Sequence, residues 1–456
     1  MGAAATDSGF EIVRDDATLR VEFCTPGIVR IRGWHGPEPP MNALLRYDLW
    51  RREWPPVEVA TDLGARTGSA AGELLSVALR GDGTLSVAGA DGEALLQGFE
   101  PPMLGPDPGF RARFALPEDE RFFGLGDQAR DRIEHRGTRR DLWVRNVQEY
   151  IPIPFMISTR GYGLLIQSTR RVWYDLGATS ADWFGFEAED EHLDLYVLAG
   201  PTPLEVIDRY TQLTGRPFLP PRWALGLWYI CHVQADARGL LADAKGFRDE
   251  GIPCDCIGLE PGWMETFYDF SVDKRWSDER FRVPRYDRNK TTFFAAAQRM
   301  GFKPGLWLCN DYDLSWEEER RVAPELRTAE ATAEPEEAAF AQSHEIDEHF
   351  ANAQRRIDRL TRPEEPWFRH LQEFVFEGAH WFKQDGASQV LDHPDRLYGN
   401  GMHDDQMHNL YPLLYSKQMY LGFAEYSGRR TFPFTCSGWA GVQRWTGTWT
   451  GDTGGG

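Results

Sequence analysis

The sequence has no long apolar run, and none of its 456 residues lies in a stretch that approaches the length of a membrane span. Its N-terminus also lacks a basic start followed by an apolar segment, so we expect a cytoplasmic protein without a membrane partner. Basic residues are in the minority, because 50 Lys and Arg face 70 Asp and Glu. The net charge of −20 argues against nucleic acid as a partner and favours a neutral ligand.

Cysteine is scarce as well, and the six cysteines do not have the paired spacing of a zinc site. Apart from Cys254 and Cys256 they stand singly in apolar runs, which predicts reduced thiols inside the core. His403 and His408 are five residues apart, so a helix would place them on different sides. The sequence therefore predicts neither a metal site nor a cofactor.

Two sequence patterns divide the chain. Residues 1–216 consist mainly of short alternating stretches broken by Gly, Pro and Asp, which is typical of an all-β sandwich. A proline-rich joint at 217–221 follows, after which strand-like and helix-like runs alternate. We therefore predict an N-terminal β-sandwich domain at 1–216 and a β/α barrel domain at 217–456. Within the barrel, residues 311–362 are rich in Glu, Arg and Ala and are predicted to form a charged, solvated helical insertion.

The barrel half contains about six β/α units. Strand-like apolar runs are expected at 222–230, 252–260, 303–309, 381–386, 431–438 and 447–452. A closed barrel of this type needs eight strands. We therefore expect a (β/α)8-type barrel that is incomplete at its C-terminus, in a chain that is itself truncated there.

Three acidic residues follow predicted strands directly: Glu260, Asp385 and Asp452. The C-terminal ends of barrel strands face one open mouth, so we expect these carboxylates to converge there. Two such carboxylates suit glycoside hydrolysis, in which one attacks the anomeric carbon and the other protonates the leaving oxygen. Each one alone is more simply explained as a cap of the next helix. Lys383 faces the same side of its strand as Asp385 and would keep that carboxylate ionised.

Several stretches are similar to signatures of glycoside hydrolase family 31, beginning with FFGLGDQ at 122–128 and IPIPFMIS at 151–158. The resemblance continues through PPRWALGLW, DCIGLEPGW, YDFS and GLW and covers nearly the whole chain. It implies a retaining, exo-acting α-glycosidase on an α-linked oligosaccharide or glycoconjugate, and a homo-oligomer is compatible with it. Asp385 would be the nucleophile and Asp452, in a Trp-x-Gly-Asp stretch, the acid/base. Retention would place their carboxyl groups about 5 to 6 Å apart.

The resemblance also implies residues of the sugar pocket. Glu260 stands where the family holds the innermost sugar with an acidic residue, usually aspartate. Trp307 and Trp449 match tryptophans of the pocket wall. The other candidate substrate-binding residues are Trp263, Lys383, Cys436 and Trp439.

The sequence departs from the family at Cys436. Many members carry an arginine before a comparable Ser-Gly-x-Ala-Gly stretch, where it contacts the sugar near its 2-hydroxyl, and Arg429 or Arg444 are candidates to replace it here. A cysteine leaves room for a bulkier 2-substituent, and the local pattern resembles the family's α-N-acetylgalactosaminidase branch. We therefore expect α-linked N-acetylgalactosamine as the sugar, with an α-glucoside, α-galactoside or α-xyloside as alternatives. A carbohydrate-binding protein that does not cleave its ligand is the alternative from another functional class.

Overall fold

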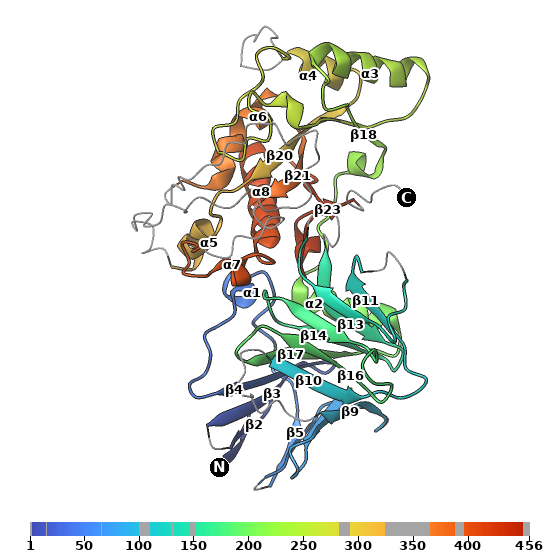
Figure 1. The fold of residues 1–456 in the computed structure, drawn as a ribbon, viewed down its shortest axis with the longest axis vertical. Helices are drawn as coiled ribbons and strands as arrows, with labels where there is room; N and C mark the ends of the chain where they lie inside the picture. Colours follow the sequence, from blue (N-terminus) through green and yellow to red (C-terminus); the bar gives the residue numbers. More distant parts are fainter. Residues whose placement is uncertain are drawn as a thin grey trace. The chain divides into compact units, whose positions relative to one another are not determined.

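The computed structural model describes residues 2–14, 16–64, 66–99, 110–128, 132–145, 151–281, 292–323, 365–387 and 396–449. It contains two compact units (Figure 1). The first comprises Met1–Val144, Ile151–Arg216 and Trp439–Gly441. The second comprises Arg145–Tyr150, Pro217–Gly438 and Val442–Gly456.

The described residues of the first unit form three antiparallel sheets. An eight-stranded sheet has the order β1 (Gly2–Thr6), β2 (Gly9–Arg14), β3 (Ala17–Thr25), β4 (Ile28–His35), β17 (Leu193–Ala199), β14 (Tyr162–Ile166), β13 (Pro152–Ser158) and β11 (Phe122–Gly126). A four-stranded sheet has the order β10 (Phe110–Ala115), β16 (Trp183–Ala188), β15 (Val172–Asp175) and β12 (Arg139–Leu142). A five-stranded sheet has the order β5 (Ala60–Leu63), β6 (Gly68–Ala71), β7 (Leu75–Leu79), β8 (Leu85–Gly89) and β9 (Ala94–Phe99). The helices are α1 (Ala43–Arg46) and α2 (Pro203–Thr214).

The core of this unit lies between the eight-stranded and four-stranded sheets. Along β10, Phe110 and Phe114 are buried while Arg111 and Arg113 between them are exposed, as expected for a sheet with one solvated face. The ring of Phe122 from the larger sheet lies 4.8 Å from that of Phe184 from the smaller one. Tyr174 donates a hydrogen bond of 3.1 Å across the same layer to the Pro154 carbonyl. The predicted β-sandwich is thus confirmed.

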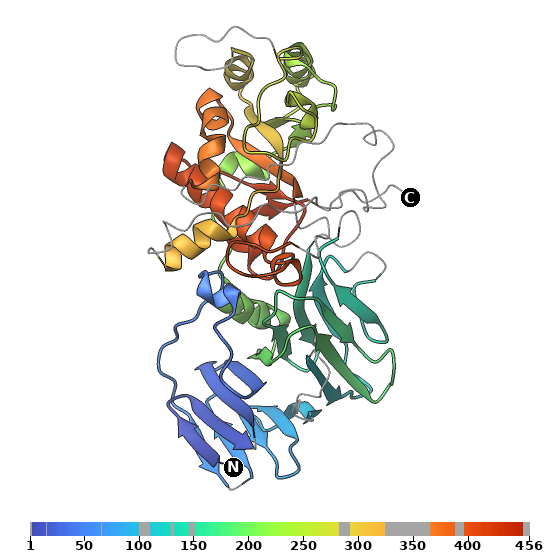
Figure 2. The same ribbon diagram turned by 60° about the vertical axis from the view of Figure 1, so that its left-hand side comes forward.

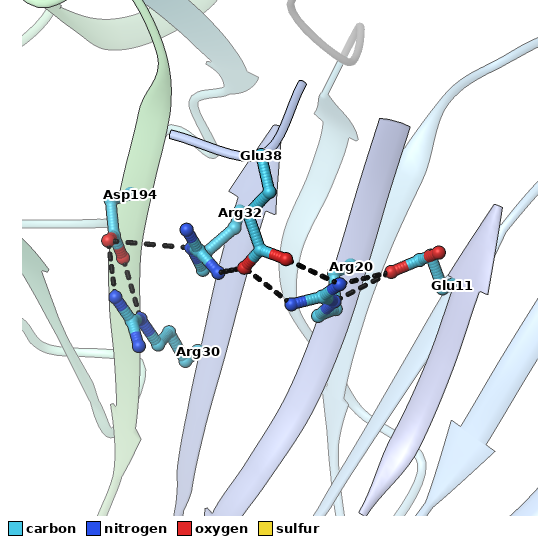
Figure 3. Close-up of polar contacts among 6 residues, drawn as sticks. All are labelled: Glu11, Arg20, Arg30, Arg32, Glu38 and Asp194. Atoms are coloured by element: carbon cyan, nitrogen blue, oxygen red, sulfur yellow. Dashed lines mark hydrogen bonds and ion pairs between the residues drawn. The ribbon is translucent and has the colours of Figure 1, made fainter. Parts of the chain in front are cut away.

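A ladder of alternating charges crosses one region of the eight-stranded sheet (Figure 3). Its members come from β2, β3, β4, β17 and the segment after β4, and they are Glu11, Arg20, Glu38, Arg32, Asp194 and Arg30. Glu38 joins two of the strands, because its carboxylate lies 2.7 Å from Arg20 Nη1 and 2.6 Å from Arg32 Nη1. Burial by itself raises the pKa of Glu38, but the hydrogen bonds from Arg32 and Arg20 outweigh burial and lower the pKa.

We expect Glu38→Gln to lower the melting temperature of the first unit at pH 7. The free energy of unfolding should fall by no more than about 1 kcal/mol, because Glu38 is 46% exposed and solvent screens its ion pairs. A lowered pKa gives stability that is present above the unfolded-state pKa and is lost as the pH falls through the folded-state pKa. The difference between wild type and variant should therefore shrink below about pH 4, as scanning calorimetry across that range would show.

Glu53→Gln is the matched control for this measurement, because Glu53 is 87% exposed and lies 4.0 Å from Arg52. Glu53→Gln should leave the melting temperature unchanged both at pH 7 and at about pH 3. A Glu38→Gln effect that is the same at pH 7 and at about pH 3 would contradict the ion-pair explanation.

The second unit is built around one parallel sheet whose strands are ordered as they occur in the chain. The six strands within its described residues are β18 (Trp228–Ile230), β19 (Cys256–Leu259), β20 (Lys303–Asn310), β21 (Trp381–Ala387), β22 (Phe434–Thr435) and β23 (Gly447–Thr448). The helices are α3 (Ala237–Asp249), α4 (Thr292–Arg299), α5 (Ser315–Val322), α6 (Gln372–Glu377), α7 (Asp404–Met407) and α8 (Tyr411–Ser427). Helices α3 and α4 pack against each other (Figures 1 and 2). This is the predicted barrel, which the six strands leave open.

Trp381, the first residue of β21, is fully buried against one face of the sheet. Glycines face it on two neighbouring strands. A Cβ atom on Gly258 would lie 2.4 Å from the Trp381 ring, and one on Gly305 would lie 2.1 Å from it. Any larger side chain at these positions would collide with the indole. Because side chains alternate along a strand, Lys383 and Asp385 point to the same side of the sheet as Trp381, nearer the C-terminal end of β21.

Two parts of the second unit differ from the sequence prediction. The strand expected at 222–230 begins only at Trp228, because Arg222–Leu225 forms a 3-10 helix. The charged stretch at 311–362 was expected to be solvated, but its described part contains α5, in which Glu318, Glu319 and Arg320 are buried. The remainder of that stretch, residues 324–362, lies outside the described residues.

The six cysteines all belong to the described residues, and they are buried and form no disulfide, which confirms the prediction of core thiols. Across the described segments, the helices are too short or too polar to cross a membrane.

Candidate active site

The candidate residues lie at the C-terminal ends of adjacent parallel strands. Glu260 directly follows β19, and Asp385 lies near the end of β21. Trp307 on β20 is paired in register with Lys383 on β21. Cys436 follows β22 directly. The parallel arrangement therefore brings to one edge of the sheet residues that are up to 176 positions apart in the chain (436 − 260 = 176).

Lys383 bridges the two carboxylates of this edge. Its Nζ donates a hydrogen bond of 3.1 Å to Glu260 Oε1 and lies 3.5 Å from Asp385 Oδ2. The same Nζ lies 5.0 Å from the centre of the Trp449 ring, a distance at which a cation is attracted to the ring face. The side chains of Lys383, Glu260 and Asp385 are 14%, 22% and 17% exposed. The group is thus mostly enclosed but reachable from solvent.

The carboxylate of Asp385 is held at both oxygens. Trp307 Nε1 donates to Asp385 Oδ2 at 3.1 Å, and Cys436 Sγ donates to Asp385 Oδ1 at 3.3 Å. Trp307 is itself fixed, because Trp263 Nε1 donates to the Trp307 carbonyl at 2.8 Å. Trp263 is only 1% exposed and therefore supports Trp307 rather than facing the solvent. The orientation of the Asp385 carboxylate is set by rigid, buried neighbours.

Two predicted residues are not part of this group of contacts. Trp439 belongs to the first unit, where it is fully buried and its indole N–H donates to the Ser168 carbonyl at 2.7 Å. Asp452 lies outside the described residues, so its expected distance of about 5 to 6 Å from Asp385 stays a prediction. Each of the two candidates for the missing arginine lies over an aromatic ring. The guanidinium of Arg429 lies 5.5 Å from the centre of the Phe423 ring, and the guanidinium of Arg444 lies 4.6 Å from the centre of the Trp445 ring.

Sequence reasoning missed two residues beside the candidate group. Tyr268 packs edge-on against Trp307 at 5.2 Å, and its φ of 54° is in the left-handed region, which is unusual for a residue other than glycine. Its only sequence signal was the YDFS stretch. Cys309 lies at the end of β20, and its thiol donates to the Asp269 carbonyl at 3.1 Å. Burial raises the pKa of Cys309, so this thiol stays protonated.

The loops after β20 and β21 are joined by buried polar contacts. Arg396 donates to the carboxylate and, at 2.9 Å, to the carbonyl oxygen of Asp311. The guanidinium also lies 4.4 Å from the Tyr398 ring. Asp313 accepts a hydrogen bond of 2.6 Å from the Gly399 amide. These contacts fix the segment that follows the Asp385 strand against the loop that follows the Trp307 strand.

Within the described residues no group of three His, Cys, Asp or Glu side chains is placed to hold a metal ion. Instead, the ammonium group of Lys383 lies between the carboxylates of Glu260 and Asp385. Among the described residues, this edge therefore presents two carboxylates, the ammonium group of Lys383, the thiol of Cys436 and the ring of Trp449.

Comparison with known proteins identifies both units. Residues 217–455 match the glycosyl hydrolases family 31 TIM-barrel domain, and residues 18–175 match the glycosyl hydrolase 31 N-terminal galactose mutarotase-like domain. The chain is 25% identical to an α-xylosidase of Emericella nidulans over 75% of its own length and 43% of the relative's. It is 26% identical to α-glucosidase 2 of Bacillus thermoamyloliquefaciens over 74% of its length and 44% of that protein.

Solved structures show the same fold. A GH31 dextranase of Flavobacterium johnsoniae, complexed with isomaltotriose, superimposes with a TM-score of 0.80 at 22% identity, over 100% of this chain and 56% of the dextranase. The chain spans less than half the length of the two curated relatives named above. Because the barrel-domain match covers more than half of its residues, the chain belongs to glycoside hydrolase family 31.

Proposed function

We propose that this chain carries the nucleophile of a retaining α-glycoside hydrolase. One observation supports this above all: the Asp385 carboxylate is held at both oxygens by Trp307 and Cys436, with the Lys383 ammonium group 3.5 Å away. An ammonium group at this distance attracts the negative charge of a carboxylate nucleophile and helps to hold it in place. Fixing both oxygens orients the carboxylate before the substrate arrives, which lowers the entropic cost of reaching the transition state.

The proposed reaction has two displacements. In the first, a lone pair of the Asp385 carboxylate forms a bond to the anomeric carbon while the bond from that carbon to the leaving oxygen breaks. The electron pair of the broken bond goes to the leaving oxygen, which takes a proton from the proposed acid, Asp452. In the second, Asp452 removes a proton from water, the water oxygen attacks the anomeric carbon, and Asp385 is released. Two inversions at the same carbon retain the α configuration.

Glu260 and Trp449 are proposed to bind the sugar in this reaction. The Glu260 carboxylate accepts a hydrogen bond of 3.1 Å from Lys383 and is 22% exposed, and a carboxylate is the kind of acceptor to which sugar hydroxyls donate. Trp449 is partly exposed beside Lys383 and offers an aromatic face to a sugar ring. Trp307 fixes the nucleophile rather than contacting much solvent, because it is only 3% exposed.

Two sugar classes have support. The relatives named above are an α-xylosidase and an α-glucosidase, which favours an α-xyloside or α-glucoside as substrate. Cys436 beside Asp385, where many family members carry an arginine, favours a sugar with a bulkier 2-substituent, such as α-linked N-acetylgalactosamine. A site that must pair the polar atoms of a substituent discriminates more strongly than one that only leaves space for it.

The experiment is a hydrolysis assay of the whole protein on a panel of aryl α-glycosides, namely xyloside, glucoside, galactoside and N-acetylgalactosaminide. A fluorinated glycosyl fluoride of the best sugar should then leave a covalent ester on Asp385, located by peptide mass spectrometry. The first product seen by proton NMR should be the α-anomer. An ester on another residue would reject Asp385 as nucleophile. Sugar binding without hydrolysis of any panel member would establish a carbohydrate-binding protein instead.

A further inference from the structure

The outer face of the four-stranded sheet in the first unit carries two tryptophans among charged side chains. Side chains alternate along each strand, so one set faces the core and the other faces outwards. On β10 and β16, which are labelled in Figure 1, the inward set is apolar and buried. The charged and aromatic residues of the outward set are exposed or partly exposed. We call them the tryptophan face, and they are Arg111, Arg113, Arg139, Asp141, Trp173, Asp175, Trp183 and Glu187.

The strand register separates the two tryptophans of this face. Trp173 on β15 is paired with Glu187 on β16, and Trp183 precedes Glu187 by four residues on β16. A strand rises about 3.3 Å per residue and neighbouring strands lie about 4.8 Å apart, so the Cα atoms of the two tryptophans are roughly 14 Å apart. A ligand that contacts both rings must therefore be a chain and not a single sugar ring.

Each tryptophan of this face is held by an arginine. The guanidinium of Arg113 lies 4.4 Å from the centre of the Trp183 ring, and the guanidinium of Arg171 lies 5.0 Å from the centre of the Trp173 ring. At these distances a cation is attracted to the face of the ring. Arg171 is fixed in turn, because its Nε donates a hydrogen bond of 2.8 Å to Asp141 Oδ1. Both rings are therefore ordered before a ligand arrives, which lowers the entropic cost of binding.

The side chains around the two rings offer both donors and acceptors of hydrogen bonds. Arg111 and Arg139 are exposed and carry guanidinium donors, and Glu187 is exposed and carries a carboxylate acceptor. A sugar hydroxyl both donates and accepts, and the C–H side of a sugar ring is apolar enough to lie against an aromatic ring. The tryptophan face therefore has the groups that recognise a carbohydrate.

Other classes of ligand fit this face less well. An anionic polymer would meet Glu187 on the face and would approach a protein with a net charge of −20. An apolar partner would have to take the exposed Arg111 and Arg139 out of water without pairing them, which is costly. A neutral polymer with many hydroxyl groups meets neither obstacle.

We propose that the tryptophan face is a carbohydrate-binding site, which takes a neutral polysaccharide chain across Trp173 and Trp183. None of its residues belongs to the candidate active site, so this binding goes beyond the proposed hydrolysis and does not depend on it. When the protein hydrolyses a polymer, the tryptophan face raises the effective concentration of that polymer, as expected for two linked binding sites. A small aryl glycoside is too short to contact both rings and gains nothing from the face.

Affinity electrophoresis of the whole protein, in native gels that contain dextran, glycogen or xyloglucan, tests the binding. We expect at least one of these neutral polysaccharides to retard the wild type. The double variant Trp173→Ala, Trp183→Ala should raise the dissociation constant for that polysaccharide about tenfold or more, because two aromatic contact areas are lost. The double variant Trp173→Phe, Trp183→Phe keeps an aromatic ring at both positions and should stay within about threefold of the wild type.

Trp54→Ala is the matched control. Trp54 is also a partly exposed tryptophan of the first unit, and the Arg51 guanidinium lies 4.4 Å from the centre of its ring, but it lies outside the four-stranded sheet. This variant should bind the polysaccharide like the wild type, and a thermal melt shows whether each variant is folded. Equal binding by the wild type and the double alanine variant would overturn the proposal. Retardation of the wild type by none of the three polysaccharides, or by anionic polygalacturonate alone, would overturn it as well.

Kinetics distinguish this proposal from the proposed hydrolysis. On a bound polysaccharide that the protein hydrolyses, the double alanine variant should raise KM about tenfold with little change in kcat, while kcat/KM on an aryl α-glycoside stays unchanged. An equal loss on both substrates would show that the two tryptophans are structural and would overturn the proposal. A protein that hydrolyses no glycoside, but whose retardation depends on Trp173 and Trp183, would reject the proposed function and confirm the carbohydrate-binding site.

Discussion

Asp385→Asn is expected to lower kcat/KM on the best aryl α-glycoside roughly ten-thousandfold. The amide has nearly the shape of the carboxylate and still offers an oxygen to Trp307, whose indole donates to Asp385 Oδ2 at 3.1 Å. It is neutral, however, and a poor nucleophile, so the ester to the anomeric carbon no longer forms. The measurement is steady-state hydrolysis by the whole protein, together with a thermal melt that shows the variant to be folded.

Asp243→Asn is the matched control, because Asp243 lies on α3 of the same unit and accepts a hydrogen bond of 3.3 Å from the Tyr229 hydroxyl. It should retain the activity of the wild type. Asp385→Gly, assayed with azide, should regain turnover, because azide can enter the vacated space and attack the anomeric carbon in place of the carboxylate. The product would then be the β-glycosyl azide. Residual activity of Asp385→Asn within tenfold of wild type would show that another group is the nucleophile.

The proximity of Lys383 and Asp385 is a direct consequence of strand geometry, since residues two apart on a strand point to the same side. The two-residue spacing of Lys383 and Asp385 therefore predicted that their side chains lie close together, and Lys383 Nζ lies 3.5 Å from Asp385 Oδ2. The hydrogen bond from Lys383 to Glu260 depends on more than one element. It requires β19, β20 and β21 to be adjacent in one parallel sheet, as a β/α barrel places them.

The contact between Cys436 and Asp385 was beyond sequence reasoning. Cys436 was selected because of the residue type expected at its position, which says what the sugar would meet there but not which protein atom the thiol contacts. The same limit applies to Trp439. A tryptophan beside a predicted strand end suits a pocket wall and a core equally well, and only the structure shows its indole N–H bound to the Ser168 carbonyl.

The burial of α5 is the clearest difference from the sequence prediction, and its cause lies on another helix. The run of Glu and Arg in Ser315–Val322 is typical of a solvated surface. Helix α8, however, carries Lys417 and Gln418 in its buried part. Lys417 Nζ lies 2.6 Å from Glu318 Oε2, and Gln418 Nε2 donates to Glu318 Oε1 at 3.2 Å. The lysine among the many apolar residues of α8 was the sequence signal that a buried acidic partner exists.

Lys417→Met should therefore destabilise the second unit by about 3 to 5 kcal/mol. Its partner Glu318 is completely buried, so removal of the ammonium group takes away its buried cation and leaves it the guanidinium of Arg321, which lies 4.0 Å away and is 41% exposed and therefore screened by solvent. Hydrogen exchange of the α8 amides gives the free energy of unfolding of the second unit, which contains Lys417 and Glu318, and this free energy should fall by the stated amount in the variant.

Two further variants decide whether the buried charge is the cause. Lys245→Met breaks an exposed pair with Asp249 on α3, whose side chains are 68% and 56% exposed, and should cost no more than about 0.5 kcal/mol. The double variant Lys417→Met, Glu318→Leu removes both buried charges and should recover most of the lost stability, because apolar side chains of similar size fill the same space without a desolvation penalty. If the double variant is as unstable as Lys417→Met alone, the loss comes from the packing of the lysine stem, and the carboxylate of Glu318 is not the source of the instability.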